Sequence, residues 1–200
     1  MGEHYYSKNP QVTSAPKRWK AEIRDRSFTF STDSGVFSKN GIDEGSQLLA
    51  ETFKEPGIRG DFLEIGCGYG PVALSIAASF PERIVHMVDV NERALALSGT
   101  NAEINGIRNV KIYESSGVER VGAGQFAAVV TNPPIRAGKQ TVFSFYQGAF
   151  EKLAQGGELW VVIQKKQGAP STIEYLKKLF GNVETAAKRK GYFILLAKKG

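Results

Sequence analysis

The sequence has few of the residues that form covalent cross-links or bind metals. Cys67 is the only cysteine, and the two histidines, His4 and His86, lie far apart in the 200 residues. One cysteine cannot form an intrachain disulfide, and a structural zinc site draws on several Cys and His ligands. The composition therefore indicates a cytoplasmic protein and disfavours a bound metal.

Long apolar runs are missing as well. No stretch approaches the roughly 20 apolar residues that a membrane-spanning helix needs, and residues 1–6 lack the apolar segment of a secretory signal. With 42% hydrophobic and 23% charged residues, the composition is that of a soluble globular protein. A chain of 200 residues suits a single domain, 1–200, with a sizeable core.

Acidic residues are outnumbered by basic ones. Lys and Arg total 26 and Asp and Glu total 20, which gives a net charge of +6 and a pI near 9.4. A basic electrostatic potential is the main contribution to nonspecific nucleic-acid affinity, so the balance favours a nucleic-acid substrate without choosing one. The basic residues cluster at 17–20, 24–26, 165–166, 177–178, 188–190 and 198–199.

Helical and strand patterns alternate from residue 43 onward, which is typical of a doubly wound, mainly parallel sheet. The last two strand patterns are separated only by 189–191, which predicts an antiparallel C-terminal hairpin. Such a hairpin favours the seven-stranded sheet of methyltransferases over an all-parallel dinucleotide fold. Helices are expected at 43–53, 72–80, 91–105, 139–153 and 170–180, and strands at 61–65, 83–88, 110–113, 126–131, 158–164, 183–188 and 192–197.

The first forty residues are expected to be irregular. They are polar and aromatic, with basic residues among the aromatic ones. We expect this extension, 1–40, to pack on or flank the catalytic core, where it could clamp a substrate or simply cover one face of the sheet.

A glycine-rich segment follows the first core strand. Gly66, Gly68 and Gly70 allow the backbone to turn tightly and to approach a ligand closely. Ligands of such sheets bind beyond the carboxyl ends of the strands, near the point where the strand order reverses. Glycines alone are also compatible with a nicotinamide cofactor. Glu64 at the start of the loop, however, suits the ammonium of S-adenosylmethionine better than it suits a pyrophosphate.

Asp89 ends the second core strand, 19 residues after Gly70. An acidic side chain there can accept hydrogen bonds from both ribose hydroxyls of a nucleoside cofactor. Val90 beside it can lie against the adenine ring.

The strand at 126–131 ends in Asn132-Pro133-Pro134-Ile135. Proline lacks a backbone donor and pushes the preceding residue toward an extended conformation, so this segment is a stiff bend. The bend holds the amide of Asn132 and the carbonyl of Pro133 in fixed directions. Two neighbouring acceptors suit a planar amino group with two N–H donors. Most Pro-Pro bends are only turns, so the prediction of a catalytic loop depends on the cofactor loop.

With these motifs in this order, the chain resembles the class I S-adenosylmethionine-dependent methyltransferases. More narrowly, it is similar to the methyltransferase small domain family, which includes the small-subunit ribosomal RNA guanine-N2 methyltransferases. The resemblance covers most of the chain and is carried by residues 35–38, 43–46, 64–70, 89, 132–139 and 158–164.

The resemblance implies roles for these residues. Asn132 and Pro133 are expected to hold the amino group that is methylated. Pro134 and Ile135 belong to the same catalytic segment. The methionine end of the cofactor is supported by Glu64. The cofactor site is expected to contain Gly66, Cys67, Gly68, Gly70, Asp89 and Val90, with Phe37 and Ser38 as a flap.

Two positions depart from the family pattern. Ser116 stands near the end of the third core strand, where relatives often carry an acidic residue that binds the adenine amine; as a candidate cofactor-binding residue, it could accept that hydrogen bond more weakly. Ile135 stands where an aromatic residue commonly stacks on the target base, and isoleucine lacks the aromatic quadrupole.

The implied reaction is methyl transfer from S-adenosylmethionine to an exocyclic amino nitrogen, with guanine N2 of small-subunit ribosomal RNA or its particle as the expected acceptor. A protein glutamine amide is an alternative acceptor, because it is also a planar NH2. DNA adenine is another, disfavoured because no separate recognition domain is evident. A noncatalytic RNA-binding relative is the third alternative, and the intact Gly66, Asp89 and Asn132 argue against it. The oligomeric state cannot be read from the sequence.

Overall fold

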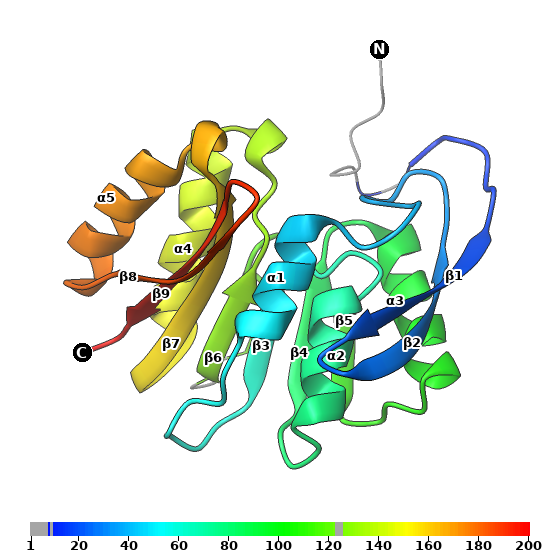
Figure 1. Ribbon diagram of the computed structural model, residues 1–200, viewed down its shortest axis with the longest axis horizontal. Coiled ribbons are helices and arrows are strands. Elements are labelled where there is room, and N and C mark those ends of the chain that lie inside the picture. The colour runs from blue at the N-terminus through cyan, green and yellow to red at the C-terminus, as the bar shows by residue number, and fades with distance from the viewer. Residues whose placement is uncertain (1–7, 9, 123–125) are drawn as a thin grey trace.

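The structure is a computed structural model that describes residues 8, 10–122 and 126–200. Residues 1–7 and 9, which belong to the expected N-terminal extension, lie outside the described residues. A seven-stranded sheet forms the centre, with helices on both faces (Figure 1). Its strand order is β5-β4-β3-β6-β7-β9-β8; β9 pairs antiparallel with β7 and with β8, and the other pairs are parallel. The predicted mainly parallel sheet with an antiparallel C-terminal hairpin is confirmed.

The core elements follow the expected alternation, with ends that shift by a few residues. The helices are α1 (Glu44–Thr52), α2 (Pro71–Ser79), α3 (Glu92–Ile104), α4 (Lys139–Lys152) and α5 (Ala169–Phe180), with short 3-10 turns η1 (Ile135–Ala137) and η2 (Lys165–Gln167). The strands of the main sheet are β3 (Phe62–Ile65), β4 (Val85–Asp89), β5 (Val110–Glu114), β6 (Phe126–Thr131), β7 (Leu153–Gln164), β8 (Glu184–Arg189) and β9 (Tyr192–Lys198).

Two predictions about local structure are wrong. Residues 17–32 are not irregular: β1 (Lys17–Ile23) and β2 (Arg26–Thr32) form an antiparallel hairpin. Its two-residue turn is Arg24-Asp25, with φ of 54° and 57°, so it lacks the Asn-Gly or Asp-Gly pair that usually marks such a turn. The strand expected at 158–164 begins earlier, because β7 already starts at Leu153 and includes Gly156 and Gly157.

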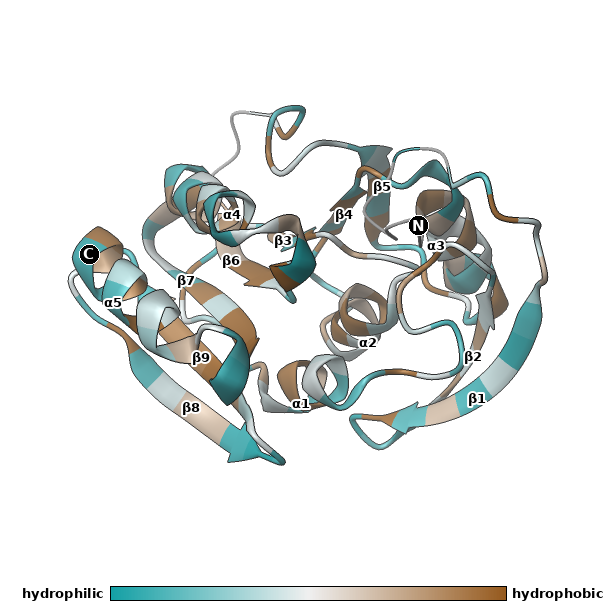
Figure 2. Cartoon of the chain, turned by 90° about the horizontal axis from the view of Figure 1, so that it is seen from above, coloured by the Kyte–Doolittle hydropathy of each residue, from teal (hydrophilic) through white to brown (hydrophobic). Residues whose placement is uncertain are grey.

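Alternation of side chains along the strands divides the core into two layers. Phe62 of β3 packs in the layer formed with α1, α2, α3 and the β1–β2 hairpin, whereas Leu63 and Ile65 pack in the layer formed with α4 and α5. Successive residues of a strand point to opposite faces of a sheet. Seen from the carboxyl ends of the parallel strands, the two sets of helices lie on opposite sides of the sheet with their hydrophobic residues turned inward (Figure 2).

The strand order reverses between β3 and β6. These two strands pair in parallel, with Ile65 opposite Thr131, and the Thr131 hydroxyl donates to the Ile65 carbonyl at 2.9 Å. The residues that follow, Gly66 and Asn132, therefore leave the sheet side by side. Sheets of this kind bind ligands at this reversal point.

Buried polar contacts join the β1–β2 hairpin to the core. Asn101 of α3 is fully buried; its Oδ1 accepts from the Ser31 amide at 2.6 Å, and its Nδ2 donates to the carbonyls of Ser31 and Tyr69 at 3.0 and 2.9 Å. One side chain thus connects β2, α3 and the glycine-rich loop. No described helix is both long enough and apolar enough to cross a bilayer.

We expect Asn101→Leu to lower the free energy of unfolding by about 3–5 kcal/mol, because it leaves three buried backbone groups without partners. Denaturant unfolding measures the effect. Thr100→Ala, on the exposed face of the same helix, is the control and should change stability by less than about 0.5 kcal/mol. Equal stability of the two variants would contradict the role of Asn101.

Candidate active site

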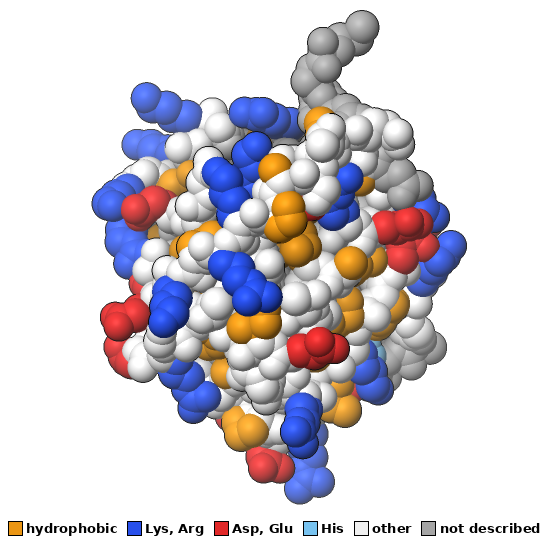
Figure 3. Space-filling model, turned by 90° about the vertical axis from the view of Figure 1, so that its right-hand side faces the viewer, with side chains coloured by type: hydrophobic (Ala, Val, Ile, Leu, Met, Phe, Trp, Pro, Cys, Tyr) orange, Lys and Arg blue, Asp and Glu red, His pale blue; other side chains and the backbone are white. Residues whose placement is uncertain are grey.

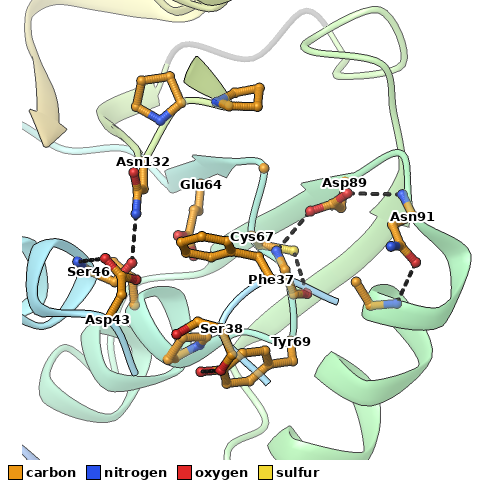
Figure 4. Close-up of a pocket in the computed structure, with 17 residues that line it drawn as sticks. Phe37, Ser38, Asp43, Ser46, Glu64, Cys67, Tyr69, Asp89, Asn91 and Asn132 are labelled. Atoms are coloured by element: carbon orange, nitrogen blue, oxygen red, sulfur yellow. Dashed lines mark hydrogen bonds between the residues drawn. The ribbon is translucent and has the colours of Figure 1, made fainter. Parts of the chain in front are cut away.

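A cavity lies at the reversal point of the sheet, and ten of the residues predicted for the site line it. Figure 4 shows Asp89 and Asn91 at one end of this cavity, Asp43, Ser46 and Asn132 at the other, and Glu64 between them. The predicted residues in its lining are Phe37, Ser38, Glu64, Gly66, Cys67, Gly68, Asp89, Asn132, Pro133 and Pro134.

The glycine-rich loop is held by the strand beside it. The amides of Gly66 and Cys67 both donate to the Val88 carbonyl of β4, at 2.9 and 3.0 Å. Gly66 and Gly68 have φ of 75° and 56°, a left-handed conformation that strongly favours glycine. The loop therefore exposes its backbone to the cavity, and any residue with a Cβ at position 66 or 68 would be strained.

Asp89 is positioned by backbone amides. Its Oδ2 accepts from Gly68 N at 2.8 Å and its Oδ1 from Asn91 N at 2.9 Å. Burial raises the pKa of Asp89, while these two amides oppose the rise. A carboxylate has about four acceptor sites, so the oxygens retain lone pairs for the two hydroxyls of a ribose.

Glu64 is a buried carboxylate near the centre of the cavity. Its side chain is nearly inaccessible, and burial raises its pKa well above the ordinary value. Oε2 accepts from Ala73 N of α2 at 2.9 Å; within the described residues, no cation lies within ion-pair distance of it and no donor contacts Oε1. A buried carboxyl group without a cation fits the ammonium of an amino-acid moiety, whose charge would favour the ionised carboxylate, so the residues present fit S-adenosylmethionine.

Asn132 is held in one orientation by a residue that the sequence did not predict for the site. Its Nδ2 donates to the Ser46 hydroxyl at 2.9 Å, which leaves Oδ1 available as an acceptor. Neither Oδ1 nor the Pro133 carbonyl contacts a donor in the described part of the chain. Two acceptors thus stand side by side on the bend, as the sequence predicted for binding an amino group.

The flap that contains Phe37 and Ser38 is attached to the cofactor side of the cavity. Asn91 Nδ2 donates to the Gly35 carbonyl at 2.9 Å, and the Tyr69 hydroxyl donates to the Gly41 carbonyl at 3.4 Å. Ser38 has a φ of 53°, which is uncommon for a non-glycine residue and often marks functional segments. Phe37 is 41% exposed, so the flap presents an aromatic ring at the cavity.

Four predicted residues lie outside the cavity lining. Gly70 caps α2, and a Cβ there would come within 2.7 Å of Met87, which indicates a packing role. Ser116 is exposed, and Val90 does not line the cavity. Ile135 lines a separate hollow with Lys139 and residues of η2 and α5.

Several lining residues were not predicted, among them Asp43, Ser46, Tyr69 and Asn91. They come from the start of α1, the glycine-rich loop and the start of α3. Two of them, Asp43 and Asn91, are helix N-caps, and the sequence placed both at the starts of expected helices without naming either as a site residue. The described residues contain no group of three or more His, Cys, Asp or Glu arranged to hold a metal.

The fold and this arrangement define a class I S-adenosylmethionine-dependent methyltransferase, and S-adenosylmethionine is the methyl donor of that class. A family model described as the methyltransferase small domain matches residues 27–196. The chain belongs to this family.

Relatives support the assignment. The chain is 54% identical over 200 residues, its full length and that of the relative, to "Uncharacterized protein YbxB" of Bacillus subtilis. It is 34% identical over 159 residues to the ribosomal RNA small subunit methyltransferase C of Salmonella choleraesuis, covering 78% of this chain and 45% of that protein. It thus spans about half the length of the curated ribosomal RNA methyltransferases that it matches.

A solved structure has the same fold over nearly the whole chain. The T. thermophilus 16S rRNA N2 G1207 methyltransferase, in complex with AdoMet and guanosine, superimposes with a TM-score of 0.83 at 27% identity, over 96% of this chain and 52% of that one. A methyltransferase from Pyrococcus furiosus, at 23% identity, shares the fold with a TM-score of 0.67 over 84% of this chain and 90% of that one.

We expect Glu64→Gln to weaken S-adenosylmethionine binding at least tenfold, about 1.4 kcal/mol, without destabilising the protein. Burial raises the folded-state pKa of Glu64, so its contribution to stability is lost as the pH rises through that pKa. Glutamine does not titrate, and the variant should equal or exceed the wild type in stability at neutral pH. Calorimetric titration and thermal unfolding measure the two effects, and unchanged affinity would contradict the role of Glu64.

Proposed function

We propose that the protein transfers a methyl group from S-adenosylmethionine to the exocyclic N2 amino group of a guanine in RNA, with small-subunit ribosomal RNA as the substrate. The observation that carries the proposal is the pair of acceptors, Asn132 Oδ1 and the Pro133 carbonyl, in the same cavity as Glu64 and Asp89. An amino-group acceptor site and a cofactor site thus share one cavity.

The protein would catalyse the reaction mainly by holding the target amine in the orientation that methyl transfer requires. An exocyclic amine is a weak nucleophile because its lone pair is delocalised into the ring. Asn132 and Pro133 each accept one N–H, which draws the nitrogen toward tetrahedral geometry and frees the lone pair. Ser46 fixes the Asn132 amide so that its oxygen, not its nitrogen, meets the amine. Alignment of this kind contributes several kcal/mol to catalysis, on the order of 7–11 in well-oriented cases.

The cofactor would be held by residues at the other end of the cavity. Glu64 would contact its ammonium, Asp89 its ribose hydroxyls, and the backbone of Gly66 and Gly68 would lie against it. When bound, S-adenosylmethionine would supply an electrophilic methyl group: an N–C bond forms as the C–S bond breaks, S-adenosylhomocysteine leaves, and the methylated nitrogen then releases one proton to water. The flap at Phe37 and Ser38 would cover the bound molecule and exclude water.

RNA is favoured over a protein amide by the relatives and by charge. The matched T. thermophilus enzyme acts on N2 of a guanine in 16S rRNA. On the face that carries the β1–β2 hairpin, basic residues are dispersed among acidic, neutral and apolar side chains (Figure 3). Dispersed charge alone gives no docking position.

Four basic residues follow the two strands at the catalytic bend. Arg136 and Lys139 come directly after the bend that ends β6, and Lys165 and Lys166 lie in η2, which follows the neighbouring strand β7. All four are exposed, and none has a carboxylate within ion-pair distance in the described part of the chain. We name these four residues the η1–η2 rim, and propose that they contact RNA phosphates near the target base.

Radiolabelled methyl transfer to total RNA and total protein of cells lacking this chain tests the proposed function. We expect label in RNA, and nucleoside analysis should identify N2-methylguanosine. Asn132→Ala should lower the rate roughly 100-fold or more, with cofactor affinity nearly unchanged. Label confined to protein would support the glutamine-amide alternative. Absence of both transfer and cofactor binding would support a noncatalytic relative.

The rim is tested with two matched pairs of lysines. Replacing Lys165 and Lys166 with glutamine should weaken RNA binding and reduce the slope of log affinity against log salt by up to about 2, since each phosphate contact contributes about 0.7–0.9. The control replaces Lys177 and Lys178, an exposed pair near the other end of α5. Equal slopes for the two double variants would contradict a specific role of the rim.

A further inference from the structure

We propose that Asp43 recognises the target base by accepting a hydrogen bond from an N–H next to the methylated amino group, which in guanine is N1–H. This inference rests on the proposed function and identifies the residue that would select guanine. From the sequence, Asp43 was placed only at the start of the expected helix 43–53 and in the segment 43–46 that carries the family resemblance.

The contacts of Asp43 leave half of its carboxylate available. Its Oδ1 accepts from Gly45 N and Ser46 N, both at 3.1 Å, and so caps α1. No donor contacts Oδ2 in the described part of the chain, and no cation lies within ion-pair distance of the carboxylate. The nearby Lys190 pairs with Glu44 instead, at 2.7 Å. Because Asp43 lines the cavity, its remaining acceptor capacity is available to a molecule that binds there.

The position of Asp43 assigns it to the acceptor base rather than to the cofactor. Asp43 contacts Ser46, and Ser46 contacts Asn132, so these three residues form one continuous wall. Figure 4 shows this wall at the end of the cavity opposite Asp89, with Glu64 between them. Glu64 is thus the carboxylate nearer the centre of the cavity, where it can meet the cofactor ammonium.

The chemistry of the possible acceptors makes such a carboxylate selective. In guanine, the C2 amino group lies beside N1–H, a donor parallel to one amino N–H. In adenine and cytosine, the ring nitrogen beside the amino group is an acceptor, and in a glutamine amide the neighbour is a carbonyl oxygen. A carboxylate next to the Asn132 amide oxygen would pair with guanine. It would repel adenine, cytosine and a glutamine amide, because each presents a second hydrogen-bond acceptor there.

The test compares two neighbouring acidic residues. Asp43→Asn keeps a good helix N-cap but removes the charge, and Asp43→Ser is a second capping variant in case the first unfolds. Glu44→Gln removes an adjacent exposed charge as the control. For the full chain and each variant, methyl transfer is measured on small-subunit ribosomal RNA from cells lacking the protein. Cofactor affinity is measured by titration with S-adenosylmethionine alone.

We expect Asp43→Asn to slow transfer roughly 10- to 100-fold, the worth of one hydrogen bond to a charged group, while the cofactor Kd stays within twofold. Glu44→Gln should match the wild type in both. Wild-type transfer rates in Asp43→Asn would overturn the inference. So would a tenfold weaker cofactor Kd, because Asp43 would then hold the cofactor.

Competition with nucleosides, compared between the wild type and Asp43→Asn, tests the contact with N1–H. 2-Aminopurine riboside carries the same C2 amino group as guanosine but has an acceptor at N1 and no oxygen at C6. Guanosine should inhibit wild-type RNA methylation at concentrations at least tenfold lower, and the difference should shrink in Asp43→Asn. No difference in the wild type would overturn the inference. Wild-type label on a base other than guanine would instead show that the proposed function is wrong.

Discussion

The parallel pairing of β3 with β6 is the constraint on which the site depends. Ile65 lies opposite Thr131, and its carbonyl accepts a hydrogen bond from the Thr131 hydroxyl. The glycine-rich loop and the Asn-Pro-Pro bend therefore begin at neighbouring points of the sheet. The two segments are separated by more than sixty residues of sequence and by two other strands in chain order. Because the strand order reverses between them, the connections diverge and leave a cavity. Asp89 joins the same cavity because β4 pairs with β3 on its other side.

The site combines a buried carboxyl group, Glu64, and a half-buried one, Asp89, with backbone donors that only partly satisfy them. Burial raises the pKa values of Glu64 and Asp89, and Glu64 lacks a cation among the described residues. Groups of this kind cost stability in the folded protein, and a bound ligand with complementary charge or hydroxyl donors offsets that cost. We therefore expect a bound cofactor to stabilise the folded protein.

The acceptor end of the cavity is shaped by α1 and the flap before it, not by the catalytic bend alone. Ser46 orients Asn132, and Asp43 caps the helix that carries Ser46. Such contacts were beyond sequence reasoning, because Asp43 and Ser46 have an ordinary explanation at the start of a helix. The β1–β2 hairpin escaped prediction for a similar reason: its Arg24-Asp25 turn lacks glycine, and its anchor, Asn101, lies in a distant helix.

The sequence alone predicted the alternation of helices and strands, the antiparallel C-terminal hairpin, and the bend at Asn132 and Pro133. These features depend on hydrophobic periodicity, glycine and proline, which determine backbone conformation over a few residues. Only the tertiary structure decided which polar side chains share the cavity, which carboxylate is buried without a cation, and which way the Asn132 amide faces. Those properties depend on strand order and on contacts such as that of Ser46 with Asn132, 86 residues apart in the chain. Local sequence patterns carry no information about contacts over that separation.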